Sequence, residues 1–189
     1  MQVGDQSPGQ PPAGFVAAVS LDGKHRFGKK PQLSLSLLAG LGVAGDAHAG
    51  RLIKHRYLAR RDPRLPNLRQ VHLFPSETLG ALSAAGYDVG PGDLGENITT
   101  TGLDLEILPL DTELRMGASA CIRLTGLRTP CVLIDRYRSG LRSRLVSRKP
   151  GPPFRAGVMA ITIASGTVAA GDPIWAVLPS SSRCPLLPL

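Results

Sequence analysis

Aromatic residues and cysteines are both scarce in this sequence, and each shortage argues against a class of protein. Aromatic side chains make up 4% of the 189 residues, too few for the stacking platforms on which single-stranded nucleic acids bind. The three cysteines, at positions 121, 131 and 184, are odd in number and include no CxxC pair. This count argues against a disulfide framework and a structural zinc site, and fits a reducing compartment.

Long apolar runs and acidic residues are also in short supply. No run approaches the roughly 18 apolar residues of a membrane-spanning helix, and the N-terminus lacks the features of a signal peptide. We therefore expect a cytoplasmic protein with no membrane segment. The 22 basic residues exceed the 14 acidic ones, giving a net charge of +8. Such an excess favours anionic partners: phosphorylated small molecules, oxyanions, acidic proteins or nucleic acid.

Short strands account for most of the recognisable secondary structure. Alternating or β-branched segments bounded by glycine or proline predict strands over residues 15–21, 32–39, 69–74, 118–126, 157–166 and 173–179. Two short helices are predicted over 75–86 and 132–140. We expect a mainly β protein, a β-barrel with a few short helices, spanning 14–179. The Gln-, Pro- and Gly-rich residues 1–13 and the Ser- and Pro-rich residues 180–189 are predicted to be disordered.

The segment GLGVAG (40–45) has the glycine spacing of a dinucleotide-binding loop. Gly50 interrupts the helix that should follow, and no alternation of strands and helices surrounds the segment. We interpret these glycines as positions of sharp turns. Asp46 and His48 come directly afterwards, and they suit either a ligand site or a simple turn closed by the aspartate.

A second glycine-rich segment, GPGDLGENITTTG (90–102), carries several polar groups. Glu96 and Asn97 offer carboxylate and amide groups, and three threonines follow them. The segment suits an anion-binding loop, whose backbone N–H groups face the ligand, as well as a bulged hairpin. Elsewhere, residues 51–69 and 128–149 each hold seven Lys and Arg residues against one acid. These clusters suit a phosphate-bearing ligand, an acidic partner or a solvated surface.

Cys131 differs from the other two cysteines in its neighbours. Pro130 precedes it directly, and Arg128 lies three residues upstream, where a guanidinium would favour the reactive thiolate. An inert buried cysteine is the alternative interpretation. Cys121 falls on the polar face of its predicted strand without an evident task, and Cys184 lies in the predicted tail.

Several segments, taken in order, resemble the MOSC domain, the C-terminal domain of molybdenum cofactor sulfurases. They are HRFGK (25–29), GVAGDAHAG (42–50), RQVHLF (69–74), PGDLGENITTTGLDL (91–105), LRTPC (127–131) and RAGVMA (155–160). The resemblance runs from about residue 15 to about residue 178. It implies a β-rich barrel similar to the small barrel domain of pyruvate kinase, in agreement with the predicted strands.

The resemblance also implies a molybdenum cofactor, a pyranopterin phosphate whose dithiolene holds the metal. Cys131 is then the functional thiol, either as a ligand to molybdenum or as a persulfide carrier, and soft thiolate sulfur suits such a centre. Asp46, His48, Glu96 and Asn97 would line the pocket. Arg69, Arg128 and Arg155 are our candidates to hold phosphate or oxo groups, on grounds of charge and motif position.

Two hypotheses about activity follow from the resemblance. The first is an oxidoreductase that reduces N-hydroxylated or N-oxide compounds, and an apolar-walled mouth beside Cys131 would favour it. The second is a carrier of sulfur or cofactor with no turnover of its own, favoured by a shallow basic surface. Pyridoxal phosphate is not expected, because the aminotransferase-like domain of full sulfurases is absent from this sequence. A separate electron-donor or sulfur-donor protein is expected, whereas RNA binding is a less favoured third hypothesis.

Overall fold

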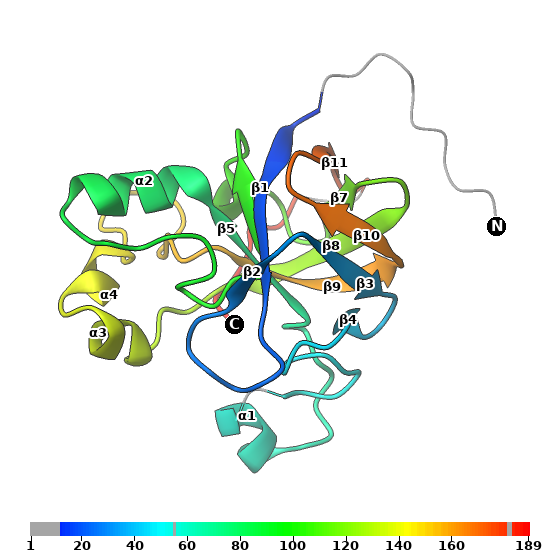
Figure 1. Cartoon of the computed structure of the whole chain (residues 1–189), viewed down its shortest axis with the longest axis horizontal. Coiled ribbons are helices and arrows are strands. Elements are labelled where there is room, and N and C mark those ends of the chain that lie inside the picture. The colour runs from blue at the N-terminus through cyan, green and yellow to red at the C-terminus, as the bar shows by residue number, and fades with distance from the viewer. Residues whose placement is uncertain (1–11, 55, 181–182) are drawn as a thin grey trace.

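The central feature of the computed structural model is a closed barrel of seven strands (Figure 1). The structure describes residues 12–54, 56–180 and 183–189. In order around the barrel, the strands are β11 (Pro173–Val177), β7 (Glu113–Met116), β8 (Ala120–Leu127), β9 (Val158–Ala164), β5 (Val71–Pro75), β6 (Ile98–Thr101) and β1 (Gly14–Leu21). Pairing of β1 with β11 closes the ring. Neighbouring strands are antiparallel except for the parallel pair β5 and β6, so the predicted β-barrel is confirmed.

Short strands outside the ring extend it on one side. β2 (Lys30–Gln32) pairs with β1, and β3 (Ser34–Leu38) lies between β10 (Gly166–Ala169) and β4 (Gly42–Val43) in a separate small sheet. The predicted alternation holds in β3, because Leu35 and Leu37 are each 1% exposed. Leu33 precedes the strand and is 96% exposed, so the buried leucines begin at Leu35, two residues later than the sequence predicts.

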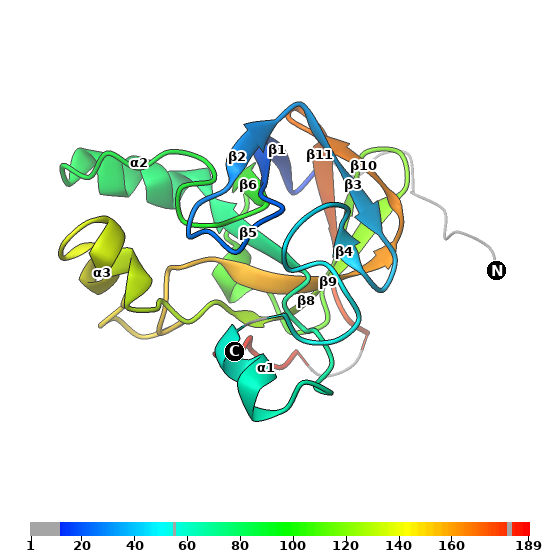
Figure 2. The same ribbon diagram turned by 60° about the horizontal axis from the view of Figure 1, so that its bottom comes forward.

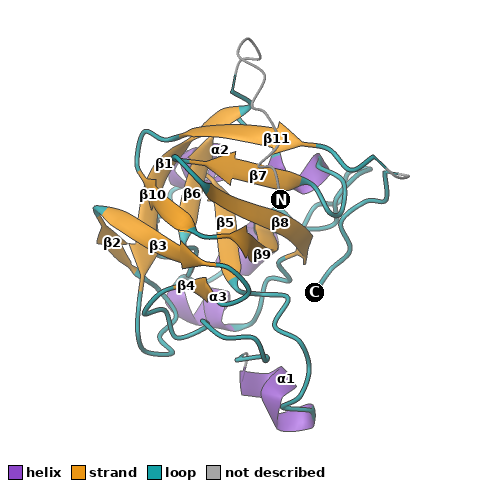
Figure 3. Cartoon of the chain, turned by 90° about the vertical axis from the view of Figure 1, so that its right-hand side faces the viewer, coloured by secondary structure: helices purple, strands orange, loops and turns teal. Residues whose placement is uncertain are grey.

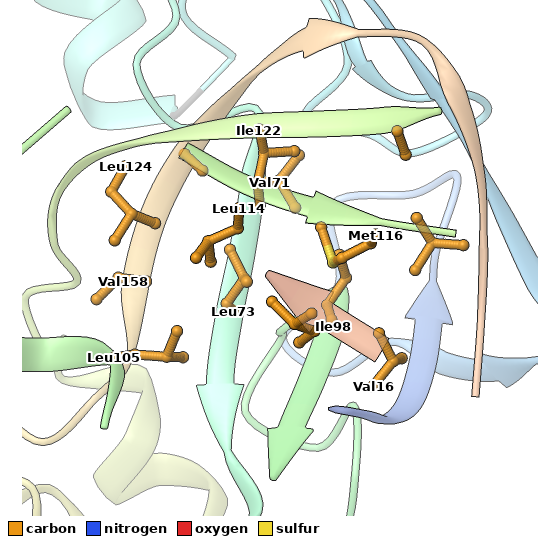
Figure 4. Packing of buried hydrophobic residues seen from close by; sticks show 14 of the residues in the cluster. Val16, Val71, Leu73, Ile98, Leu105, Leu114, Met116, Ile122, Leu124 and Val158 are labelled. Atoms are coloured by element: carbon orange, nitrogen blue, oxygen red, sulfur yellow. The ribbon is translucent and has the colours of Figure 1, made fainter. Parts of the chain in front are cut away.

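The barrel interior is filled by apolar side chains from all seven strands (Figure 4). Leu114 and Met116 come from β7, Ile122 and Leu124 from β8, and all four are at most 1% exposed. Full burial of one such side chain stabilises the fold by about 1.5–3 kcal/mol. Packing across the barrel axis therefore holds together strands that are far apart in the sequence.

The four helices in the described residues are short, and three of them lie on one side of the barrel (Figures 1 and 2). These are α2 (Ser76–Ala84), α3 (Leu133–Tyr137) and α4 (Leu141–Arg144), which share a second apolar cluster with Phe74 and Leu94. α1 (Arg56–Arg61) stands away from the barrel (Figure 3), and η1 (Leu105–Ile107) is a single 3₁₀ turn. None of the helices within the described ranges is long and apolar enough to cross a membrane.

Two sequence predictions about helices and turns have clear outcomes. The helix predicted over 132–140 is α3, which ends earlier than predicted, at Tyr137. Gly140 takes a left-handed conformation, with φ 77°, and α4 begins directly after it. In GLGVAG, all three glycines have positive φ. The segment contains the short strand β4 and is followed by turns, where a dinucleotide-binding loop would open a helix. The interpretation of these glycines as turn positions is confirmed.

The C-terminal segment differs from its sequence prediction. Residues 180–189 are predicted to be disordered, yet residues 183–189 lie against the barrel beside the end of β8 (Figure 3). Leu186 is 4% exposed and joins the barrel core, so apolar burial explains why this proline-rich segment is held. The prediction for the N-terminus concerns mainly residues 1–11, which lie outside the described residues, while Ala13 already donates a backbone hydrogen bond to Ile174.

Candidate functional site

A cleft of about 160 Å³ opens at the end of the barrel where β5 and β6 begin and where β1 and β8 end. Four of the residues that the sequence singles out line it: His48, Arg69, Asn97 and Arg128. The remaining lining residues are Arg26, Phe27, Lys29, His72, Leu94, Gly95, Thr129, Leu133 and Met159. The chain reaches this end of the barrel by five separate loops, which explains why motifs far apart in the sequence meet here.

Asp46 lies behind the cleft wall, where it organises three neighbours. One carboxylate oxygen accepts hydrogen bonds from Lys29 Nζ at 2.5 Å and Asn97 Nδ2 at 2.9 Å. The other accepts from the backbone N–H of His48 at 2.9 Å, closing the turn that the sequence suggested, and lies 3.3 Å from His48 Nδ1. Burial alone would raise the pKa of Asp46, but the His48 hydrogen bond and the Lys29 charge outweigh it and hold that pKa well below its usual range.

Asn97 is buried and fully occupied by contacts within the protein. Its side-chain oxygen accepts the backbone N–H of His72 at 3.2 Å, and its amide donates to Ser20 O at 3.3 Å as well as to Asp46. A side chain with so many internal partners cannot turn toward a ligand without losing them. Asp46 and Asn97 therefore shape the cleft, and Lys29 and His48 are the groups that they present to it.

Arg128 and Arg69 supply the strongest electrostatic feature of the cleft. Arg128 is 9% exposed, its Nη2 donates to Leu94 O at 3.2 Å, and its buried Nη1 has no hydrogen-bond partner. Within the described chain, neither guanidinium has a carboxylate at ion-pair distance. Burial and the charge of Arg128 lower the pKa of Arg69. Arg128 is buried and Arg69 is half-buried, and two neighbouring cations that no carboxylate of the described chain contacts directly are costly unless an anion binds to them.

Cys131 lies next to this arginine pair. It is half-buried and does not itself line the cleft. It lies close enough to Arg69 and Arg128 for a charge on its sulfur to raise the pKa of both guanidinium groups. The turn that carries it is held from the side of α4, where Arg142 Nε donates to Pro130 O at 3.0 Å. The structure thus brings Cys131 and two of the three predicted arginines together at one place.

The other two cysteines have different surroundings. Cys121 is buried in the barrel wall, and burial, with the nearby Glu113 charge, raises its pKa to about 11, so this thiol stays protonated at neutral pH. The sequence placed Cys121 on the polar face of its strand, but the side chain is more buried than that position suggests. Cys184 is exposed in the C-terminal segment. Neither lines the cleft.

Arg155 is the predicted site residue that the structure places elsewhere. Its guanidinium pairs with Asp104 at 3.1 Å and Glu106 at 3.6 Å, in a shallow depression beside α2 and η1. These two carboxylates already neutralise it. The prediction that Arg155 joins Arg69 and Arg128 in binding an anion is therefore not supported by its position.

Glu96 is buried beneath the cleft and does not line it. One carboxyl oxygen accepts from Gly92 N at 2.7 Å and Thr99 Oγ1 at 3.3 Å, while the other is buried without a partner. Burial raises the pKa of Glu96 above its usual value, although the Gly92 hydrogen bond and the Arg128 charge oppose this. Glu96 therefore holds the loop before β6 together, and folding favours its protonated form.

Replacing Glu96 by glutamine is expected to change how stability depends on pH. Because folding raises the pKa of Glu96, the contribution of this side chain to the free energy of unfolding is complete below the usual glutamate value of 4.5. That contribution is lost as the pH rises through the folded-state pKa. Glutamine mimics the protonated acid at every pH. Urea unfolding between pH 4 and 8 should show the wild type losing stability relative to Glu96→Gln. Parallel pH profiles for the two proteins would contradict this assignment.

Sequence reasoning missed two polar groups and the apolar walls of the cleft. Lys29 ends the HRFGK segment, but nothing local marks it as the partner of Asp46. His72 stands alone in an apolar strand, which is a detectable signal, and its Nε2 lies 3.0 Å from Ala156 O. Burial and the Arg128 charge lower the pKa of His72 well below its usual value, so the ring is neutral at neutral pH. Phe27, Leu94, Leu133 and Met159 supply the apolar surface.

Comparison with known proteins agrees with the fold. The family model described as "MOSC domain" matches residues 44–175. The fold is similar to the YuaD protein from Bacillus subtilis, with a TM-score of 0.70 and 24% identity over 85% of this chain and 93% of that one. It is also similar to YiiM from Escherichia coli, with a TM-score of 0.61 and 21% identity over 90% of this chain and 73% of that one.

YiiM from Geobacillus stearothermophilus gives a TM-score of 0.58, with 15% identity over 93% of this chain and 78% of that one. No curated protein sequence matches the chain significantly. The structural likenesses establish the fold, and the family model covers most of the chain, including the Asp46, Glu96 and Cys131 motifs. On this match, the chain belongs to the MOSC domain family.

Proposed function

We propose that this protein binds a molybdenum cofactor in the cleft and reduces N-hydroxylated or N-oxide compounds there. The observation that carries the proposal is the buried, unpartnered Nη1 of Arg128 beside Arg69 and Cys131. A cation pair lacking an anion and a thiol placed next to it are the two features that an anionic, thiophilic metal centre requires.

The residues present fit such a cofactor in charge and in donor chemistry. Arg69 and Arg128 would hold phosphate or oxo groups, and Cys131 would supply a soft sulfur ligand. Among the described residues no group of three or more His, Cys, Asp or Glu side chains gathers to hold a metal ion. A metal bound through Cys131 would therefore draw its remaining ligands from the cofactor's own dithiolene and oxo groups, and the cofactor when bound would supply two-electron redox chemistry.

The cleft walls support the reductase over the carrier hypothesis. Phe27, Leu94, Leu133 and Met159 give the cleft an apolar lining beside its cations, and small-molecule sites are lined in this way. A protein-sized docking surface for sulfur transfer would need to be shallow and polar. The lining instead suits a compact organic substrate that presents one polar N–OH group.

The proposed reaction needs an external source of electrons. An N-hydroxylated compound takes up two electrons and two protons, the N–O bond breaks, and the products are the N–H compound and water. The electrons would come from a separate donor protein. No disulfide joins Cys121, Cys131 and Cys184 in the structure, which is compatible with a reducing environment.

The first experiment is to measure the metal and pterin content of the protein purified from a host that makes the cofactor. Elemental analysis reports molybdenum, and the fluorescence of oxidised pterin reports the organic part. The proposal predicts about one equivalent of each, followed by reduction of N-hydroxylated substrates with an artificial electron donor. A known molybdoenzyme loaded in the same host is the control.

The outcomes separate the two activities. Molybdenum and pterin without turnover of any N-hydroxylated substrate would favour the cofactor carrier. Absence of both, with a persulfide found on Cys131 by mass spectrometry, would favour the sulfur carrier. Absence of cofactor and of persulfide would overturn the proposal.

A further inference from the structure

The C-terminal segment 183–189 runs alongside the strand that leads into the cleft. Its backbone pairs with the end of β8, since Leu127 N donates to Leu187 O at 2.9 Å and Leu189 N donates to Leu127 O at 3.0 Å. Further back, Leu110 N donates to Cys184 O at 2.8 Å. The segment therefore acts as a short extra strand beside β8.

Two features show that β8 is shaped to receive this segment. Leu186 is buried in the barrel core. Gly126 leaves the space that the segment fills, because a Cβ at this position would lie 2.5 Å from Leu189 Cγ and 2.7 Å from Leu187 O. Gly126 lies at a register shift between β8 and β9, but its φ is outside the left-handed region. The contacts of the segment therefore give the clearest reason for a glycine here.

The segment also contacts the turn that carries the thiol. Thr129 Oγ1 donates to Leu189 O at 2.7 Å, and Thr129 lines the cleft two residues before Cys131. On the other side of this turn, Arg142 holds Pro130 O. The Thr129–Cys131 turn is thus held between the C-terminal segment and α4.

We propose that residues 183–189 form a strap that keeps Cys131 beside Arg69 and Arg128, with Gly126 and Thr129 as positioning residues. The importance of this placement rests on the proposed function, in which Cys131 is the working thiol. The strap itself depends only on the contacts described, so its test needs no cofactor.

The test compares the reaction of Cys131 with two alkylating reagents that differ in charge. In a Cys121→Ser/Cys184→Ser background, Cys131 is the only thiol. Nearby arginines accelerate the reaction of Cys131 with anionic iodoacetate relative to its reaction with neutral iodoacetamide. Because both reagents attack the thiolate, the thiolate fraction cancels in the ratio of the two rates. A general loosening of the structure would raise both rates together and leave this ratio unchanged.

Gly126→Ala is expected to lower the ratio by about threefold or more, because the displaced strap releases the turn from the arginines. Gly80→Ala is the matched control, since Gly80 in α2 has no atom within 4 Å of an added Cβ and has an ordinary backbone conformation. Arg69→Met gives the size of the effect of losing one arginine charge. The control should keep the ratio of the background protein.

The proposal would be overturned if a folded Gly126→Ala protein had the same rate ratio as the Cys121→Ser/Cys184→Ser background protein. It would also be overturned if the rate ratio of that background protein were no higher than the ratio for glutathione. If Gly126→Ala does not unfold cooperatively, Thr129→Val decides by the same measurement. It removes only the hydroxyl bond to the strap, so it should lower the ratio and Thr129→Ser should restore it. An unchanged ratio in Thr129→Val would equally overturn the proposal. Absence of cofactor from the purified protein would remove the proposed function and leave the strap intact.

Discussion

A Cys131→Ser variant produced in a cofactor-making host is expected to retain less than about a tenth of the wild-type molybdenum. The physical reason is ligand softness: a thiolate binds a thiophilic metal strongly, whereas a serine hydroxyl remains protonated and is a poor ligand. Cys131 is also the one cysteine beside the arginine pair. Metal content per folded chain, measured by elemental analysis, checks this expectation.

The other two cysteines provide matched controls for the same substitution. Cys121→Ser and Cys184→Ser should keep the metal, because Cys121 is a buried, protonated thiol in the barrel wall and Cys184 is exposed outside the cleft. Thermal unfolding should show that all three variants fold. Equal molybdenum retention in the three proteins would rule out Cys131 as the metal ligand.

The barrel was predictable because its longer strands carry their own signals. The β-branched run of β9 and the alternation of β3 mark strands locally, and both lie within the predicted ranges. The short strands β4 and β6 were missed, since two to four residues give no measurable period. β6 consists of Ile98 and three threonines inside a glycine-rich loop, and it becomes a strand only by pairing with β1 and β5.

The sequence motifs predicted which segments lie near one another, but not which of their side chains face the cleft. Arg69 and Arg128 line the cleft and Cys131 lies beside them, because their segments begin or end strands at the same end of the barrel. Which polar groups face the cleft depends on tertiary contacts. Glu96 turns inward and Arg155 meets two carboxylates, and no local pattern distinguishes either from a cleft-facing residue.

The C-terminal strap is a second case in which tertiary contacts, and not local sequence, decide the structure. Proline, serine and a single charge make residues 180–189 look like a disordered tail. A proline-rich chain is already extended, however, and it needs only one buried anchor and an open strand edge to pair. Leu186 and the missing side chain at Gly126 provide these, 60 residues apart in the sequence.

Asp46→Asn is expected to be the most destabilising of these changes, at about 3–5 kcal/mol. The Asp46 and Lys29 side chains are 0% and 6% exposed, so the substitution leaves a buried ammonium without its counter-charge. Asparagine cannot replace the carboxylate, because both oxygens accept only from donors: Lys29 and Asn97 on one side, His48 on the other. In either orientation the new amide directs its NH₂ group at another donor.

A surface ion pair of the same kind is the control for this prediction. Asp104→Asn breaks a 3.1 Å pair with Arg155 whose partners are 48% and 42% exposed, and it should cost no more than about 1 kcal/mol.

Since folding lowers the pKa of Asp46, the stabilisation by this carboxylate is present above the usual aspartate value of 3.8 and is lost as the pH falls below it. Urea unfolding should therefore show a difference in the free energy of unfolding between wild type and Asp46→Asn that is large at pH 7 and becomes smaller in acid. A difference at pH 7 no larger than that of Asp104→Asn would mean that Lys29 loses its proton in the variant and that the buried pair adds little to the stability of the cleft.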